Sequence, residues 1–146
     1  MTRKKGPGRS VKLRIKLCSF SALGPGKIEL LEGIGETGSI SKAAKRSGMS
    51  YRRAWMLVDE MNRAFALPVA DTQFGGARGG GARLTPTGQR IVDVYREILA
   101  KTEALVAVEL TALGDLLAPD LEDRSGEAER VHGKARWRSD WREENG

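Results

Sequence analysis

The sequence predicts an α+β fold that is mostly helical, a winged helix-turn-helix with a long C-terminal dimerisation helix. Two amphipathic segments, at about 40–47 and 51–66, are separated by a tight turn at Gly48. The run GGARGGGA at 75–82 separates two short β-like segments and is too rich in glycine to pack. An apolar periodic segment, 85–113, then follows and completes the element order of this fold.

The N-terminal part is expected to contain a basic arm, a strand and a helix. Residues 1–10 are basic and contain Gly and Pro, so we expect a flexible arm. Residues 11–18 alternate between apolar and polar side chains, which is the pattern of a half-buried strand. The break Gly24-Pro25-Gly26 then precedes an amphipathic helix from about Pro25 to Glu36.

Two serines are placed to begin the two helices of the helix-turn-helix. Ser39 precedes a short helix from Ile40 to about Ser47, and its hydroxyl can accept a backbone N–H bond from the first turn. Ser50 can do the same for a longer helix that ends at about Ala66, and Gly48 permits the left-handed turn between them. The longer helix has an apolar stripe with helical spacing: Ala54, Leu57, Val58, Met61 and Phe65.

The C-terminal half is expected to hold a hairpin and one long helix. Val69–Phe74 and Arg83–Leu84 are the expected strands, and Thr85-Pro86 is a strong start for a helix that continues to about Leu113 with few breaks. A near-heptad stripe on this helix predicts a homodimer interface: Ile91, Val94, Ile98, Leu105 and Val108.

These elements predict four consecutive parts. Residues 1–10 are the arm and 11–84 the winged helix-turn-helix. The dimerisation helix occupies 85–113, and 114–146 is a polar tail that we expect to be disordered.

The charge of the chain predicts a polyanionic partner. The net charge is +6, and the excess of basic over acidic residues lies before residue 114. Nucleic acid is the commonest partner of such a surface.

Composition also excludes several classes of function. The chain has one cysteine and one histidine, so we expect no disulfide, no metal site and no cofactor. No Ser/His/Asp arrangement or phosphate-binding motif is present, so we expect no catalytic residues and no enzyme. No segment has the length of a membrane helix and the start lacks a secretory signal, so a cytoplasmic location without membrane contact is expected.

The start of the longer helix carries the strongest candidates for DNA contact. The segment SYRRAW places two guanidinium groups and two aromatic rings in the first turns, and arginine can bind guanine edges or a phosphate. Tyr51 and Trp55 could instead pack within the protein. Together with outward positions around the short helix, the candidates are Ser39, Lys42, Ser50, Tyr51, Arg52, Arg53 and Trp55.

Two segments resemble a known family. GSISKAAKRSGMSYRRAWMLVDEMNRAF (38–65) and GGARGGGARLTPTGQRIVDVYREI (75–98) resemble the N-terminal DNA-binding domain of ModE-type molybdenum-dependent regulators, a relative of the LysR-type winged helix. The resemblance implies a cytoplasmic homodimer that binds a palindromic operator in double-stranded DNA and regulates molybdate-related genes. It also implies DNA contacts from the wing, here Arg78 and Arg83.

The resemblance is to a stand-alone form of this domain. Full-length members of the family carry C-terminal molybdate-binding modules, and the sequence that follows residue 113 is too short to hold them. Direct molybdate binding is therefore not expected, and the sequence identifies no small-molecule effector.

Two other functions stay open at this point. The same fold can serve as a protein-interaction or dimerisation module without specific DNA binding, or as an oxyanion sensor at a dimer interface. DNA binding predicts one continuous basic face on the dimer, formed by Lys42, Lys45, Arg46, Arg52, Arg53 and Arg78.

Overall fold

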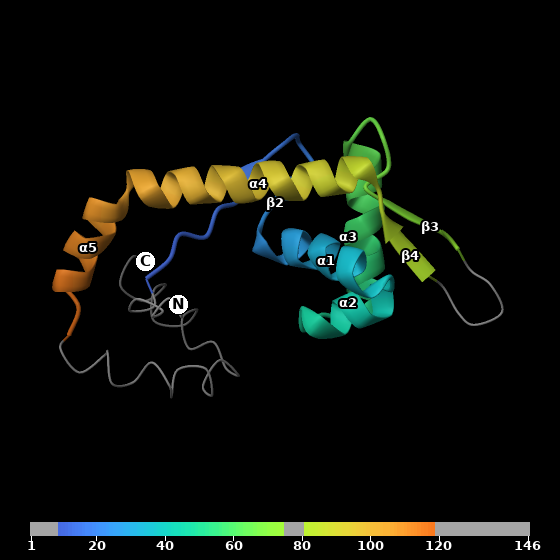
Figure 1. Cartoon of the computed structure of the whole chain (residues 1–146), viewed down its shortest axis with the longest axis horizontal. Helices are drawn as coiled ribbons and strands as arrows, with labels where there is room; N and C mark the ends of the chain where they lie inside the picture. Colours follow the sequence, from blue (N-terminus) through green and yellow to red (C-terminus); the bar gives the residue numbers. More distant parts are fainter. Residues whose placement is uncertain (1–8, 75–80, 119–146) are drawn as a thin grey trace, which may run out of the picture. The chain divides into compact units, whose positions relative to one another are not determined.

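The computed structural model describes residues 9–74 and 81–118. Three helices come first in the winged helix-turn-helix: α1 (Pro25–Thr37), α2 (Ile40–Arg46) and α3 (Tyr51–Ala64). The hairpin of β3 (Ala70–Phe74) and β4 (Gly81–Leu84) follows, and α4 (Pro86–Leu105) runs across the domain (Figure 1). This order confirms the predicted fold class, an α+β winged helix-turn-helix.

A small second hairpin precedes α1. β1 (Ile15–Lys16) pairs antiparallel with β2 (Ala22–Leu23), with Ile15 opposite Leu23. The strand expected over 11–18 is therefore too long: the chain turns after β1, where the backbone N–H groups of residues 17 and 18 both donate to the carbonyl of Ser21. The alternation itself is confirmed up to residue 16, because the apolar residues are half-buried and the basic ones exposed.

The core lies among α1, α2, α3 and α4. The apolar residues of α1 are fully buried, and α2 contributes Ala43 and Ala44. A Cβ atom added at Gly33 would lie 2.9 Å from the Cβ of Ala43, so glycine is what permits the close packing of α1 on α2. In α3 the predicted stripe is confirmed: Ala54, Val58 and Met61 are buried, and Leu57 and Phe65 pack against them.

The predicted caps of the helix-turn-helix are present. The Ser39 hydroxyl accepts a hydrogen bond from the N–H of Lys42 at 3.2 Å, and the Ser50 hydroxyl accepts one from the N–H of Arg53 at 3.1 Å. Gly48 has φ of 66°, the left-handed conformation that the turn requires. The two caps and the turn fix where α3 begins.

The helix α3 ends two residues before the expected Ala66. The backbone is already extended at Phe65. Asn62 stabilises the turn that follows, because its side-chain oxygen accepts the N–H of Val69 at 2.8 Å.

The wing hairpin begins its second strand earlier than expected. Gly81 and Ala82 were expected in the loop, but they belong to β4, and Gly81 pairs with Phe74. The physical reason is burial: the Ala82 side chain is buried, and its N–H donates to the carbonyl of Gly38 at 2.9 Å. The expected flexible loop at 75–80, which includes Arg78, lies outside the described residues.

The long C-terminal helix begins as predicted but does not continue to Leu113. The Thr85 hydroxyl accepts the N–H of Gly88 at 3.0 Å, which begins α4. Helical geometry is interrupted at Val106 (φ −103°, ψ 15°), and a separate helix, α5 (Ala107–Asp115), follows. None of the side chains at 104–108 is buried, so packing does not hold this stretch straight, and β-branched valine loses rotamer freedom in a helix.

The compact unit around the core spans Val11–Leu105 and therefore includes α4, which was expected as a separate part. The helix α5 belongs to a second unit. None of the residues of α5 is buried. Most of the expected arm, 1–10, and tail, 114–146, lies outside the described residues.

Candidate nucleic-acid interface

The first turns of α3 present an exposed surface of cations and aromatic rings. Arg52 and Arg53 are both exposed. Tyr51 is 55% exposed and packs edge-to-face against Trp55, with ring centroids 6.1 Å apart. The two rings therefore contact each other on one flank of the helix and remain accessible to a partner.

The short helix α2 adds further exposed cations. Lys42 and Lys45 are exposed, whereas Arg46 forms an ion pair with Glu36 at 2.6 Å. The candidates Ser39 and Ser50 serve as helix caps, so the hydroxyl oxygen of each already accepts a backbone hydrogen bond. Of the six cations expected to form one basic face, Lys42, Lys45, Arg52 and Arg53 are thus exposed and the charge of Arg46 is partly compensated. A continuous face on a dimer stays a prediction.

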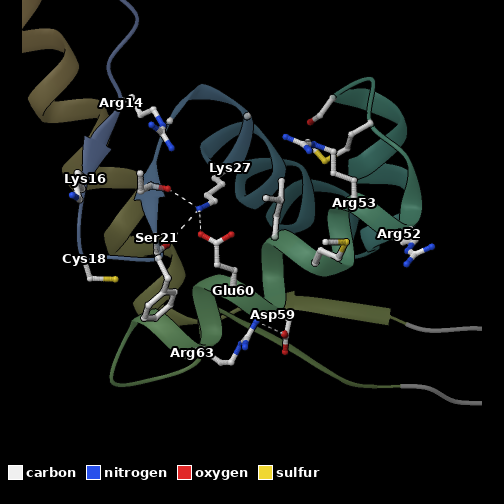
Figure 2. A pocket seen from close by; sticks show the side chains of 18 of the residues that line it. Arg14, Lys16, Cys18, Ser21, Lys27, Arg52, Arg53, Asp59, Glu60 and Arg63 are labelled. Carbon is white, nitrogen blue, oxygen red and sulfur yellow. Dashed lines mark hydrogen bonds and ion pairs between the residues drawn. The ribbon is translucent and has the colours of Figure 1, made fainter.

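An open groove of about 1400 Å³ lies between the β1–β2 hairpin and α3. In Figure 2, Arg14 and Lys16 lie on the hairpin side, while Arg52 and Arg53 extend from α3 on the other side. The turn before α3, residues 47–50, also lines this groove. The groove therefore connects the candidate DNA-binding helix to a basic surface that the sequence analysis did not select.

Lys27 and Glu60, which both line this groove, form an ion pair. The Lys27 ammonium group donates to a Glu60 carboxylate oxygen at 2.5 Å and to the Ala22 carbonyl at 2.7 Å (Figure 2). The hydrogen bond from Lys27 lowers the pKa of Glu60, against the opposing effect of its partial burial. This contact ties α1, α3 and β2 together, and so it fixes the groove.

Sequence reasoning missed this pair. The two residues lie 33 positions apart, and nothing in the local pattern of either helix distinguishes them from solvent-exposed charges. Only the tertiary fold brings Lys27 of α1 next to Glu60 of α3.

The wing candidate Arg83 lies in different surroundings. It is exposed and lines a second groove, of about 650 Å³, together with Glu32, Glu36 and Asp93. Arg96 of α4 also lines this groove and forms an ion pair with Glu32 of α1. Arg83 is therefore not part of the basic groove beside α3, and Arg78 lies outside the described residues.

The candidate dimer residues divide between two environments. Ile91 packs against the domain's own core, and Val94 is half-buried. Ile98 is 38% exposed and Leu105 is 83% exposed. Val108 is also exposed, but it lies in α5, in the other unit.

In the ranges 9–74 and 81–118, no group of three His, Cys, Asp or Glu side chains is placed to hold a metal ion. Within the same part of the chain, no helix has the length and apolar character that a membrane crossing would require.

Comparison with known proteins confirms the resemblance to ModE-type proteins. The molybdenum-pterin-binding protein MopB of Rhodobacter capsulatus is 44% identical over 85 residues, which cover 58% of this chain and 32% of that protein. The molybdenum transport protein ModE of Azotobacter vinelandii is 44% identical over 78 residues (53% and 29%). The DNA-binding transcriptional dual regulator ModE of Escherichia coli is 40% identical over 91 residues (62% and 34%).

The chain thus spans about a third of the length of these relatives. None of their names describes an enzyme, which agrees with the prediction for this chain. No family model matches it. Among solved structures, a LysR family transcriptional regulator is similar with a TM-score of 0.45 and 21% identity, covering 63% of this chain and 29% of that one.

Proposed function

We propose that this chain, a homologue of the ModE and MopB proteins, is a sequence-specific DNA-binding transcriptional regulator that acts as a cytoplasmic homodimer. The observation that carries the proposal is the exposed pair Arg52 and Arg53 at the start of the second helix of a helix-turn-helix. Homology to a DNA-binding regulator supports it.

The architecture suits the major groove of B-DNA. The helix α3 has 14 residues, and the major groove admits an α-helix whose first turns contact base edges. The buried stripe of α3 faces the core, so the two arginines extend away from it. Exposed Lys42 and Lys45 on α2 provide charge for the flanking phosphates.

The proposed dimer would use the outer face of α4. Gly88, Val92 and Tyr95 on one face are buried in the domain. Ile98 and Leu105 leave a second apolar surface exposed. A second copy would cover it, and twofold pairing would present two α3 helices to a palindromic site.

The link to molybdenum is proposed at the level of the regulated genes. The names of the relatives refer to molybdenum transport and molybdenum-pterin binding. We propose no direct molybdate site in the described residues, because the groove beside α3 is open and the cations in it that lack an ion-pair partner are exposed.

The test is selection of bound duplexes from a random pool, followed by fluorescence anisotropy with the selected sequence. If Arg52 or Arg53 reads a base, Arg52→Ala or Arg53→Ala should weaken binding by about 1–3 kcal/mol on that sequence. If the arginine holds a phosphate, binding should weaken equally on all duplexes and the salt slope should fall by about one. Lys12→Ala, which removes an exposed cation that lines neither groove, should leave affinity unchanged.

Two results would refute the proposal: a wild-type protein that enriches no sequence, or unchanged affinity in both arginine variants with the fold intact. The second would favour a protein-interaction module instead.

A further inference from the structure

We propose that the β1–β2 hairpin supplies a second set of DNA-phosphate contacts, through Arg14 and Lys16. These side chains and the arginines of α3 would hold one sugar-phosphate backbone in the groove between them. The inference rests on the proposed function, and it adds two residues to the DNA-binding surface that lie in neither the helix-turn-helix nor the wing.

The charges that line this groove favour an anionic occupant. Six cationic side chains and two carboxylates line it. Both carboxylates are paired with cations of the same groove, Asp59 with Arg63 at 3.0 Å and Glu60 with Lys27 at 2.5 Å. Among the described residues, the remaining cations have no carboxylate within ion-pair distance: Arg14, Lys16, Arg52 and Arg53.

Contacts with the core hold the β1–β2 hairpin in place on its side of the groove. Leu13 and Ile15 pack against the buried cluster, and the hydroxyl of buried Tyr95 donates to the carbonyl of Leu13 at 2.7 Å. On the other strand, β2, the carbonyl of Ala22 accepts a hydrogen bond from the Lys27 ammonium group at 2.7 Å. Arg14 and Lys16 therefore extend from a fixed backbone, so little ordering of the main chain would oppose their contact with a phosphate.

The dimensions of the groove favour an extended polyanion over a small oxyanion. Its volume of about 1400 Å³ exceeds that of ordinary small-molecule pockets, and such pockets bury most of the ligand surface. Arg14 immediately precedes β1 and Lys16 is its second residue, so the two cations lie two positions apart on one segment. All four unpaired cations are exposed, which suits phosphates that remain partly hydrated.

The test compares Arg14→Ala/Lys16→Ala with a matched control, Lys12→Ala. Lys12 is exposed on the same alternating segment but does not line the groove. Dissociation constants would be measured against salt on the selected duplex and on an unrelated one. The double variant should lower the salt slope by about 1.8 per protomer, or about 3.6 for the dimer, and weaken binding on the order of 10- to 100-fold per protomer near 0.1 M salt, equally on both duplexes.

The single variant Arg14→Lys should keep the wild-type slope, because it preserves the charge. Lys12→Ala should also stay close to the wild type, and circular dichroism melts would verify folding of every variant. A wild-type slope in the double variant, while Arg52→Ala still weakens binding, would overturn this inference and leave the proposed function standing. Calorimetric binding of sodium molybdate that the double variant loses would also overturn it, since the occupant would then be a small oxyanion.

Discussion

Gly88 is a position where α4 lies close to the wing hairpin, and Gly88→Ala tests that packing. A Cβ atom at this position would lie 2.6 Å from Cδ1 of Leu84 and 3.1 Å from the carbonyl carbon of Val69, with the Val69 oxygen closer still. Ordinary van der Waals contact begins at about 3.4 Å. The Val69 carbonyl also accepts the N–H of Thr85 at 3.1 Å, so it cannot move without straining that bond.

Two opposing effects set the magnitude. Alanine is favoured over glycine inside a helix by about 1 kcal/mol. Overpacking a well-packed core costs about 1–3 kcal/mol, and weakening the hydrogen bond to Val69 adds about 1 kcal/mol. Because the clash involves backbone atoms that cannot rotate away, we expect the upper part of this range, a net loss of about 2–3 kcal/mol.

The assay is thermal and urea unfolding followed by far-ultraviolet circular dichroism. A loss of this size corresponds to a fall in Tm of roughly 10–20 °C for a domain of about 100 residues. Gly26→Ala is a matched control, because Gly26 also lies in the first turn of a helix that begins with proline, yet a Cβ atom there would meet nothing within 4 Å. The control should be neutral or gain up to about 1 kcal/mol.

Equal stability of Gly88→Ala and Gly26→Ala would refute this reasoning, because only the steric contact distinguishes the two sites. Such a result would mean that α4 does not pack on Val69 and Leu84 as described.

Three further predictions concern the groove, pH and assembly. Tyr95→Phe leaves the Leu13 carbonyl without its donor and should cost about 1–3 kcal/mol in urea unfolding, with little change in the overall fold. Glu60 has a lowered pKa in the folded state, so its contribution to stability is present above the ordinary pKa of a glutamate, about 4.3, and is lost as the pH falls below it. The stability advantage of wild type over Glu60→Gln should therefore shrink between about pH 5 and pH 3. Leu105→Glu/Val108→Glu should sediment as a monomer at micromolar concentrations where the wild type is a dimer; a wild-type monomer would contradict the proposed assembly.

Elements whose signals are local could be predicted from the sequence. Ser39, Gly48 and Ser50 each act within three or four residues of the chain, so the starts of the two helices and the turn between them followed from residue type alone. The stripe of α3 was equally predictable, because burial there repeats with the helical period.

Features that depend on distant packing could not be predicted. The contact of Tyr95 with Leu13 joins residues 82 positions apart. The strand β2 has only two residues and exists through its pairing with β1. The interruption at Val106 carries no Pro or Gly signal, and it falls where the side chains of the helix have no core to pack against.

The most direct test of the central claim is genome-wide mapping of bound DNA in cells that express the tagged protein, alongside Arg52→Ala/Arg53→Ala. The account predicts discrete sites that share one palindromic motif, and loss of those sites in the double variant. Sites without a common motif, or occupancy that the double variant retains, would contradict the assignment of α3 as the helix that reads DNA.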